Sequence, residues 1–215
     1  MEYNVNRFIE LLLDENTRQN LVSRKSIDDE VPKHIEDSIK ILDYISLENK
    51  NIVDIGSGAG FPALVLAISC PGVPFTLVES DLKKSKFLEK VSTEINLNNV
   101  EVIRTRVEEL GQNQAYRGSF DICTCRAVAA MNILLEYGLP LLKPGGRLLL
   151  WKGRNYQQEI TEAQKALEIL GGKVTDIYLY NLMEDRDRTI VVVEKKGETP
   201  AKYPRRVGIP GKRPL

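Results

Sequence analysis

The stretch Asn51-Ile-Val-Asp-Ile-Gly-Ser-Gly-Ala-Gly60 decides the fold of this chain. A short apolar segment runs directly into three glycines at alternate positions, 56, 58 and 60. Glycine lets the backbone turn tightly and approach a ligand closely. The pattern therefore predicts a strand from Asn51 to Ile55 that ends in a ligand-binding loop.

Beyond this loop the sequence alternates between strand-like and helix-like segments. Strands are expected at 75–79, 100–103, 120–125 and 147–151. Helices are expected at 62–70, at about 81–96, from after the strand that ends at 125 through 142, and at about 156–170. Such alternation predicts a parallel sheet with helices on both faces.

The last two expected strands, about 173–182 and 188–194, have only residues 183–187 between them. That connection is too short for a crossover helix, so the two strands should pair antiparallel. A dinucleotide-binding loop of the G-x-G-x-x-G type would also need glycine at position 61, where Phe61 stands. Both features favour the class I, Rossmann-like methyltransferase fold, a mostly parallel seven-stranded sheet with an antiparallel last strand, over the wholly parallel dehydrogenases.

The first 48 residues read as a helical extension packed on this core. Apolar residues at 35, 39, 42 and 45 recur at the spacing of one helix face. We expect three parts: the extension at 1–48, the methyltransferase domain at 49–197, and a basic tail at 198–215 that belongs to the same domain.

Composition narrows the setting of the protein. The chain has 215 residues, with 30 Lys+Arg against 30 Asp+Glu. No apolar run approaches the roughly 18–20 residues of a membrane helix, and the N-terminus does not read as a secretory signal. Three cysteines and one histidine favour reduced core thiols over a metal site. We expect a cytoplasmic protein without membrane or metal, and a monomer because no dimer seam is evident.

Acidic residues at two strand ends indicate the ligand. Glu79 ends the second strand, about where an acid accepts hydrogen bonds from ribose hydroxyls. Asp54 precedes the glycine loop and can orient its amides or the ammonium of a methionine group. With Gly56, Gly58 and Gly60, these residues predict a site for S-adenosylmethionine.

Arg126 ends the fourth strand and is the only charged residue between Asp121 and Glu136. A structural ion pair is the simpler interpretation, and a cofactor or substrate contact is the one we favour. Ligands of such sheets bind at the carboxyl ends of the strands. This rule gathers Arg126 with Val107 and Glu108 around the same crevice.

The C-terminus carries a local excess of positive charge. No acid follows Glu198, and such an arm can neutralise phosphates, although a solvated terminus is the alternative. The basic residues after Glu198 are Lys202, Arg205, Arg206, Lys212 and Arg213.

Taken together, these segments resemble the RsmG (GidB) family of bacterial small-subunit rRNA methyltransferases from near the start of the chain to its end. The family usually has a glycine where this chain has Ala63 after Phe61-Pro62, which could slightly alter the approach of the backbone to the cofactor. The matching segments are Asn20-Leu21, His34-Ile-Glu-Asp-Ser38, Asp54-Ile-Gly-Ser-Gly-Ala-Gly-Phe-Pro62, Glu79-Ser80, Lys83-Lys84, Phe87-Leu88, Arg106-Val-Glu-Glu109, Arg126-Ala-Val-Ala129, Lys152-Gly153 and Tyr203-Pro-Arg-Arg-Val-Gly-Ile-Pro-Gly-Lys-Arg-Pro-Leu215.

The resemblance implies N7-methylation of one guanine in the 530 loop of 16S rRNA, on the rRNA itself or on a subunit assembly intermediate. Guanine N7 has a lone pair and no proton, which agrees with the lack of an obvious general base in the sequence. By the same resemblance, Gly56, Phe61, Val107, Glu108 and Arg126 look like cofactor contacts.

The resemblance also suggests residues on the RNA side. Positions that match its motifs and would flank the acceptor are His34, Asp37, Lys152, Arg205 and Arg206. The target base must leave its stack to be methylated. Tyr203 or Trp151 would then be candidates to stack on it, although a core position is the simpler expectation for Trp151.

Two other functions stay open on the sequence. One is a class I methyltransferase of a small molecule, which would have no use for the basic tail. The other is a non-catalytic protein that binds S-adenosylmethionine and RNA.

Overall fold

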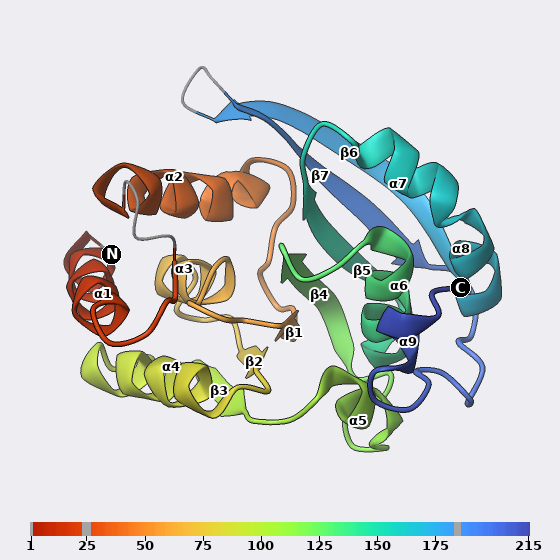
Figure 1. Cartoon of the computed structure of the whole chain (residues 1–215), viewed down its shortest axis with the longest axis horizontal. Coiled ribbons are helices and arrows are strands. Elements are labelled where there is room, and N and C mark those ends of the chain that lie inside the picture. The colour runs from red at the N-terminus through yellow and green to blue at the C-terminus, as the bar shows by residue number, and fades with distance from the viewer. Residues whose placement is uncertain (1, 23–26, 183–185) are drawn as a thin grey trace.

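The computed structural model describes residues 2–22, 27–182 and 186–215. Its centre is one seven-stranded sheet with strand order β3-β2-β1-β4-β5-β7-β6 (Figure 1). The strands are β1 (Ile52–Ile55), β2 (Phe75–Val78), β3 (Val100–Ile103), β4 (Phe120–Arg126), β5 (Leu142–Lys152), β6 (Gly172–Leu182) and β7 (Arg186–Lys195).

The pairing confirms the fold class expected from the sequence. β1 pairs in parallel with β2 and β4, and the parallel set continues to β3 on one side and β5 on the other. β7 runs antiparallel to both β5 and β6. The glycine loop follows β1 at the point where the strand order reverses, which is where open α/β sheets bind their ligands.

Helices cover both faces of the sheet and enclose two hydrophobic cores (Figure 1). Neighbouring residues of one strand face opposite cores, as Ile52 and Val53 do, because side chains alternate along a strand. The first core is covered by α1 (Glu2–Asn16), α2 (Ile27–Ile39), the 3-10 helix η1 (Lys40–Asp43), α3 (Ala63–Ser69) and α4 (Leu82–Glu94). The second face carries α5 (Val107–Gln112), α6 (Met131–Gly138), the 3-10 helix η2 (Leu139–Leu141), α7 (Tyr156–Glu162), α8 (Gln164–Leu170) and α9 (Ile209–Lys212).

Two expected helices differ from the structure. The helix expected over about 156–170 is two helices, α7 and α8, that meet at Ala163 with φ −90° and ψ 0°. α8 buries three apolar residues in the second core, whereas α7 has no buried residue. α7 packs on the same core only through its partly buried Tyr156 and Ile160, so the second half of the segment contributes most of the burial. The apolar face expected to run from 35 to 45 is also interrupted, since α2 ends at Ile39 and η1 continues it.

The C-terminal segment packs on the body of the protein. Tyr203 is buried in the second core, and the Arg117 guanidinium donates to the carbonyl oxygens of Tyr203 at 2.6 Å and Thr199 at 2.9 Å. The Arg205 guanidinium binds the buried carboxylate of Glu136, with Nη2 2.6 Å from Oε2. The segment therefore packs on the domain, and contact of its exposed cations with phosphates stays a prediction.

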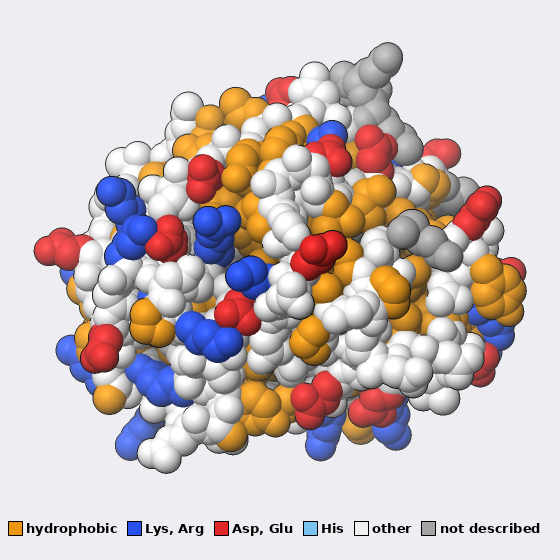
Figure 2. Space-filling view, turned by 180° about the vertical axis from the view of Figure 1, so that it is seen from behind, with side chains coloured by type: hydrophobic (Ala, Val, Ile, Leu, Met, Phe, Trp, Pro, Cys, Tyr) orange, Lys and Arg blue, Asp and Glu red, His pale blue; other side chains and the backbone are white. Residues whose placement is uncertain are grey.

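The surface agrees with the balance of charge in the sequence. On the face seen in Figure 2, Lys and Arg side chains alternate with Asp and Glu side chains. None of the described helices is both long and apolar enough to cross a membrane. The three cysteines are free thiols, and burial raises the pKa of the Cys123 thiol well above its usual value.

Candidate functional site

A cavity of about 600 Å³ opens where β1, β2 and β4 end. Its floor is the glycine loop after β1, with Glu79 after β2 and the turn 126–128 after β4. The opposite wall comes from α2, from residues 21–22 before it, and from the β6–β7 hairpin. Segments far apart in the sequence therefore meet in this cavity, at the sheet edge that the sequence predicts.

Three glycines shape the cavity floor. Gly56, Gly58 and Gly60 all have positive φ, at +70°, +53° and +94°. A Cβ on Gly56 would lie 2.6 Å from Cγ2 of Val128, and one on Gly60 would lie 2.4 Å from Cδ1 of Leu64. Gly56 thus allows the turn after β4 to close against the loop, and Gly60 allows the loop to close against α3.

Glu79 fixes the glycine loop from the neighbouring strand end. Its Oε2 accepts from the Gly58 amide at 2.9 Å and its Oε1 from the Asp81 amide at 2.8 Å. Two ionised carboxylate oxygens offer about four acceptor sites. Glu79 lines the cavity and keeps capacity to accept further hydrogen bonds, such as those from ribose hydroxyls.

Asp54 lies buried under the same loop. Its Oδ1 accepts from the Thr124 hydroxyl at 2.6 Å, while Oδ2 is a buried oxygen with no hydrogen-bond partner in the described part of the chain. Burial raises the pKa of this carboxyl to about 7, against the opposing effects of Thr124 and Ser57. An unpaired buried acceptor of this kind fits a cationic ligand group.

Asp37 on α2 is the centre of a buried charge cluster. Its carboxylate accepts from Arg126 Nη1 at 2.9 Å, from Arg188 Nη2 at 2.6 Å and from the Tyr180 hydroxyl at 2.7 Å. Its carbonyl oxygen accepts from the Trp151 indole at 2.8 Å. Burial alone would raise the pKa of Asp37, but the hydrogen bond and charge of Arg188 lower it.

This cluster settles how Arg126 is held. The Arg126 guanidinium pairs with Asp37, lies 5.0 Å from the centre of the Phe61 ring, and lines the cavity. The ion pair and the cavity position therefore coexist. The Asp37 carboxylate is committed to holding two arginines and Tyr180, so its main role in the structure is to position them.

His34 lies on the same helix, one turn before Asp37. Its ring centre is 5.2 Å from that of Phe61, and both rings line the cavity. Burial, followed by the charge of Arg126, lowers the pKa of His34 to about 4. The imidazole is therefore neutral near pH 7 and a weak base.

Other expected site residues lie away from the cavity lining. Val107 begins α5, and the Glu108 carboxylate accepts from the Gly208 amide at 2.9 Å, which fastens the C-terminal segment. Contact of these two residues with a cofactor stays a prediction. Lys152 is buried and its ammonium lies 2.6 Å from Oε2 of Glu159.

The residues of the tail that are expected to contact RNA differ in their burial and pairing. The Arg205 guanidinium is held by Glu136, while Arg206 is exposed. The Tyr203 ring is buried and is not available to stack on a base, and Trp151 is a core residue, as its alternative interpretation had it.

Sequence reasoning missed several residues of the cavity wall. Arg188 lies in the last strand, and it reaches Asp37 across 151 positions of sequence. Lys33 and Lys84 also line the cavity. Lys84 stands in a segment that already matched the family, so that match was the one available signal for it.

Comparison with known proteins shows the family to which the chain belongs. Residues 1–190 match the family model described as rRNA small subunit methyltransferase G. The chain is 62% identical over 215 residues to the ribosomal RNA small subunit methyltransferase G of Syntrophomonas wolfei, covering 100% of both. It is 44% identical to the enzyme of that name from Carboxydothermus hydrogenoformans, over 97% of this chain and 89% of that one.

Solved structures share the fold at low sequence identity. An S-adenosylmethionine-dependent methyltransferase from Aquifex aeolicus has a TM-score of 0.60 at 18% identity, covering 80% of this chain and 96% of that one. The magnesium protoporphyrin IX methyltransferase of Synechocystis, solved with bound S-adenosylmethionine, has a TM-score of 0.61 at 16% identity, covering 78% and 82%. The fold is that of the class I methyltransferases, and the chain belongs to the rRNA small subunit methyltransferase G family.

Proposed function

We propose that this protein transfers a methyl group from S-adenosylmethionine to N7 of a guanine in the 530 loop of 16S rRNA. The observation that carries the proposal is one cavity with two differently built sides. One side is the glycine loop with Glu79, above the buried Asp54, and the other brings His34, Arg126 and Arg188 together. Family membership supports the rRNA substrate, and the resemblance supplies the target base.

The residues on the loop side fit S-adenosylmethionine. The unpaired Oδ2 of Asp54 would accept from the methionine ammonium, and Glu79 would accept from the ribose hydroxyls. The positive φ of Gly56 and Gly58 gives the loop a backbone that can approach the ligand closely. When bound, S-adenosylmethionine supplies a methyl group already activated by its sulfonium.

The residues that face the acceptor provide no strong general base, which supports a nucleophilic atom that carries no proton. The carboxylates of Asp37 and Glu79 are already held by hydrogen-bond donors, and His34 with a pKa of about 4 is a weak base at neutral pH. Guanine N7 attacks through its own lone pair and needs no deprotonation. An exocyclic amine would need a base that removes a proton during attack.

The remaining task of the protein is to hold the base in line with the methyl group. In-line positioning of two reactants can supply much of the rate enhancement of such a transfer. Phe61 lies beside His34 and Arg126 and adds a buried apolar surface to the cavity wall near which a flipped base would enter. The Arg126 donors that Asp37 leaves free can orient the base through its oxygen.

The test is mass mapping of modified nucleosides in 16S rRNA, with rRNA from a strain lacking the gene as substrate. We expect one 7-methylguanosine in the 530 loop after incubation with the protein and labelled S-adenosylmethionine. Methyl label at an exocyclic amine would contradict N7 transfer. RNA without label, from a protein that binds S-adenosylmethionine, would favour a small-molecule substrate or a non-catalytic role.

A further inference from the structure

We propose that a groove between the end of α1 and α4 binds the phosphate backbone of the rRNA strand that carries the target base. This α4 groove has a volume of about 300 Å³ and contains four cationic side chains, Arg18, Lys83, Lys86 and Lys90. The inference rests on the proposed function, since it names the surface by which the same rRNA is held.

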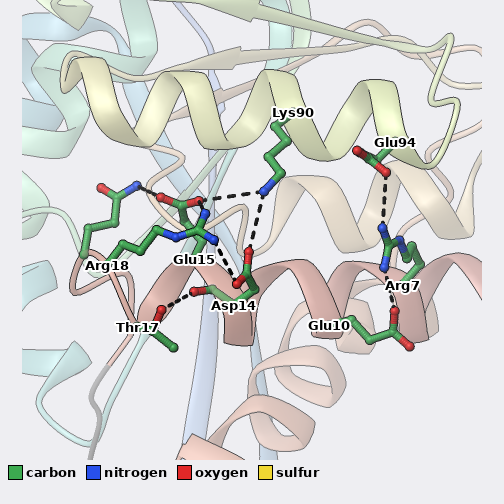
Figure 3. Close-up of polar contacts among 9 residues, drawn as sticks. Arg7, Glu10, Asp14, Glu15, Thr17, Arg18, Lys90 and Glu94 are labelled. Carbon is green, nitrogen blue, oxygen red and sulfur yellow. Dashed lines mark hydrogen bonds and ion pairs between the residues drawn. The ribbon is translucent and has the colours of Figure 1, made fainter.

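The charges of the α4 groove do not cancel. Arg18 lies 3.1 Å from Asp14 and 3.6 Å from Glu15, and Lys90 lies 3.8 Å and 4.0 Å from the same two carboxylates (Figure 3). Within the described part of the chain, Lys83 and Lys86 form no ion pair, and both are exposed. The four cations of the groove thus face the two carboxylates of α1. The Asp81 carboxylate, whose pKa is lowered by its hydrogen bonds to the Lys84 and Lys83 amides and by the charges of both lysines, is shared between these two, so positive charge stays in excess.

The ion pairs also give the groove its shape. The two acids belong to α1 and Lys90 belongs to α4, so these contacts join the helices side by side (Figure 3). The Gln19 amide adds a bond of 3.4 Å to the carbonyl oxygen of Lys83. Lys83 and Lys86 therefore stand on a supported rim, with their ammonium groups available to a phosphate.

The groove and the methyltransfer cavity share a rim. Lys83 lines the groove, and the next residue, Lys84, lines the cavity. On the facing segment, Gln19 lines the groove while Leu21 and Val22 line the cavity. A base placed in the cavity therefore brings the neighbouring phosphates of its own strand to Lys84, Lys83 and Lys86.

This continuity favours RNA over an acidic protein segment as the occupant. A strand whose base enters the cavity must cross the rim, and phosphate neutralisation by Lys and Arg dominates the affinity of such complexes. The C-terminal segment offers a less direct alternative, because Arg205 is occupied by Glu136. Tail cations such as Arg206 are exposed but do not line the cavity.

The test is the variant Lys83→Ala/Lys86→Ala in the full-length protein. Its affinity for a protein-free 16S rRNA fragment containing the 530 loop is measured over a series of KCl concentrations. We expect roughly tenfold weaker binding and a salt slope lower by about 2, since each lost phosphate contact removes about one counterion. Lys84 stays intact because it lines the cavity, and affinity for S-adenosylmethionine, measured by calorimetry, should not change.

A matched control removes the same charge elsewhere. Lys165 on α8 and Lys173 at the start of β6 are also exposed, and these elements lie across the molecule from α1 and α4 (Figure 1). Lys165→Ala/Lys173→Ala should bind RNA like the wild type, and Lys83→Arg/Lys86→Arg should restore binding. Equal losses in the two alanine pairs, or an unchanged salt slope in the first, would overturn the proposal.

Two further outcomes separate the hypotheses. If the Lys83/Lys86 variant binds protein-free rRNA normally but loses affinity for assembled small subunits, the groove holds a ribosomal protein and our assignment is wrong. If the wild type methylates rRNA and the variant matches it in binding, the groove assignment fails while the proposed function stands. A wild type that neither binds nor methylates rRNA would remove the proposed function itself.

Discussion

The carboxylate of Asp54 is buried with one oxygen unpaired, and this single group couples ligand binding to pH. With its pKa raised to about 7, the side chain loses its charge as pH falls from 8 to 6. A cationic ligand group requires the charged form. We expect affinity for S-adenosylmethionine to weaken about tenfold over that range, because about one carboxyl in ten is ionised one pH unit below its pKa.

The control is Asp54→Asn, whose affinity should be low and flat between pH 6 and 8 in calorimetric titrations. His34 does not titrate in this window, because its pKa is about 4. An affinity that keeps its full pH dependence in the Asn variant would show that another group is responsible.

The same substitution should act in the opposite direction on stability. A carboxyl whose folded pKa is raised loses stability as pH rises through that pKa, because the folded state must then bury a charge. Asp54→Asn should therefore unfold at a higher temperature than the wild type at pH 8, both without ligand. A lower melting temperature at pH 8 would contradict the cost that we assign to this buried charge.

Gly58 permits a comparison of charge at constant size. Its amide donates to Glu79 Oε2 at 2.9 Å, and the nearest atom to a Cβ placed there is 3.7 Å away. Asp and Asn both tolerate positive φ, so both variants should fold at a cost of about 1 kcal/mol. Gly58→Asp should lose S-adenosylmethionine binding in calorimetry, because a second carboxylate then faces Glu79. Gly58→Asn should retain more of the binding affinity. Equal affinities of the two variants would exclude the charge effect.

At this scale the sequence predicted part of the cavity lining: Asp54, Gly60, Val107 and Glu108 were also expected at the site but do not line the cavity. Gly56, Gly58, Phe61, Glu79 and Arg126 do line the cavity, because each lies at or near a strand end or within the loop. The wall formed by Lys33, Leu182 and Arg188 depends on contacts between distant segments, and no local pattern in one sequence encodes them.

At the scale of elements, the Asp37 side chain of α2 forms hydrogen bonds with three strands of the sheet. Asp37 binds arginines from β4 and β7 and a tyrosine from β6. Asp37→Asn leaves two partly buried guanidinium groups without their counter-charge, which should lower the free energy of unfolding by about 3 kcal/mol. Urea unfolding measures this loss.

Asp43→Asn is the matched control. Asp43 ends η1 and pairs with Lys40 at the surface. The urea midpoint of the Asp43→Asn variant should therefore equal that of the wild type within measurement. A midpoint as high in Asp37→Asn as in Asp43→Asn would mean that the cluster adds no net stability.

Element boundaries show where local pattern was sufficient. The strand β3 has the expected bounds, and α4 begins close to the expected position 81, where the Asp81 carboxylate accepts from the amides of Lys83 and Lys84. The division between α7 and α8 was not predicted, because Ala163 is a good helix former and the local sequence gives no sign of a bend. The bend depends on packing against the core, which outweighs the helix propensity of Ala163.

At the scale of the whole molecule, the C-terminal segment holds the second face together. The Glu136 carboxylate is fully buried and is bonded by both the side chain and the amide of Arg205. Arg205→Ala should therefore destabilise the fold by about 2 kcal/mol, a value reduced for the partial exposure of the arginine. Arg206→Ala removes an exposed cation and should leave the urea midpoint unchanged; the reverse order of the two midpoints would refute this account.

Charge patterning alone could not tell which cations of the basic tail are paired. The Glu136 carboxylate that binds Arg205 lies 69 positions away in the sequence, whereas phosphate contact by the exposed tail cations stays a prediction. The groups that balance a charge are known only once distant segments are in contact. Among the residues that the structure describes, Lys83, Lys84 and Lys86 form no ion pair, and Lys84 lines the cavity.

The position of β7 has a consequence for the order in which the protein is made. β7 is the last strand to leave the ribosome, yet it lies inside the sheet between β5 and β6. β6 is therefore synthesised before the only strand it pairs with in the sheet order. The edge of β6 that pairs with β7 stays unpaired until β7 has been synthesised. Arg188 belongs to β7 and can bind Asp37 only after that. Closure of the cavity by Arg188 thus follows the synthesis of β7, after the glycine loop and Glu79 have been made.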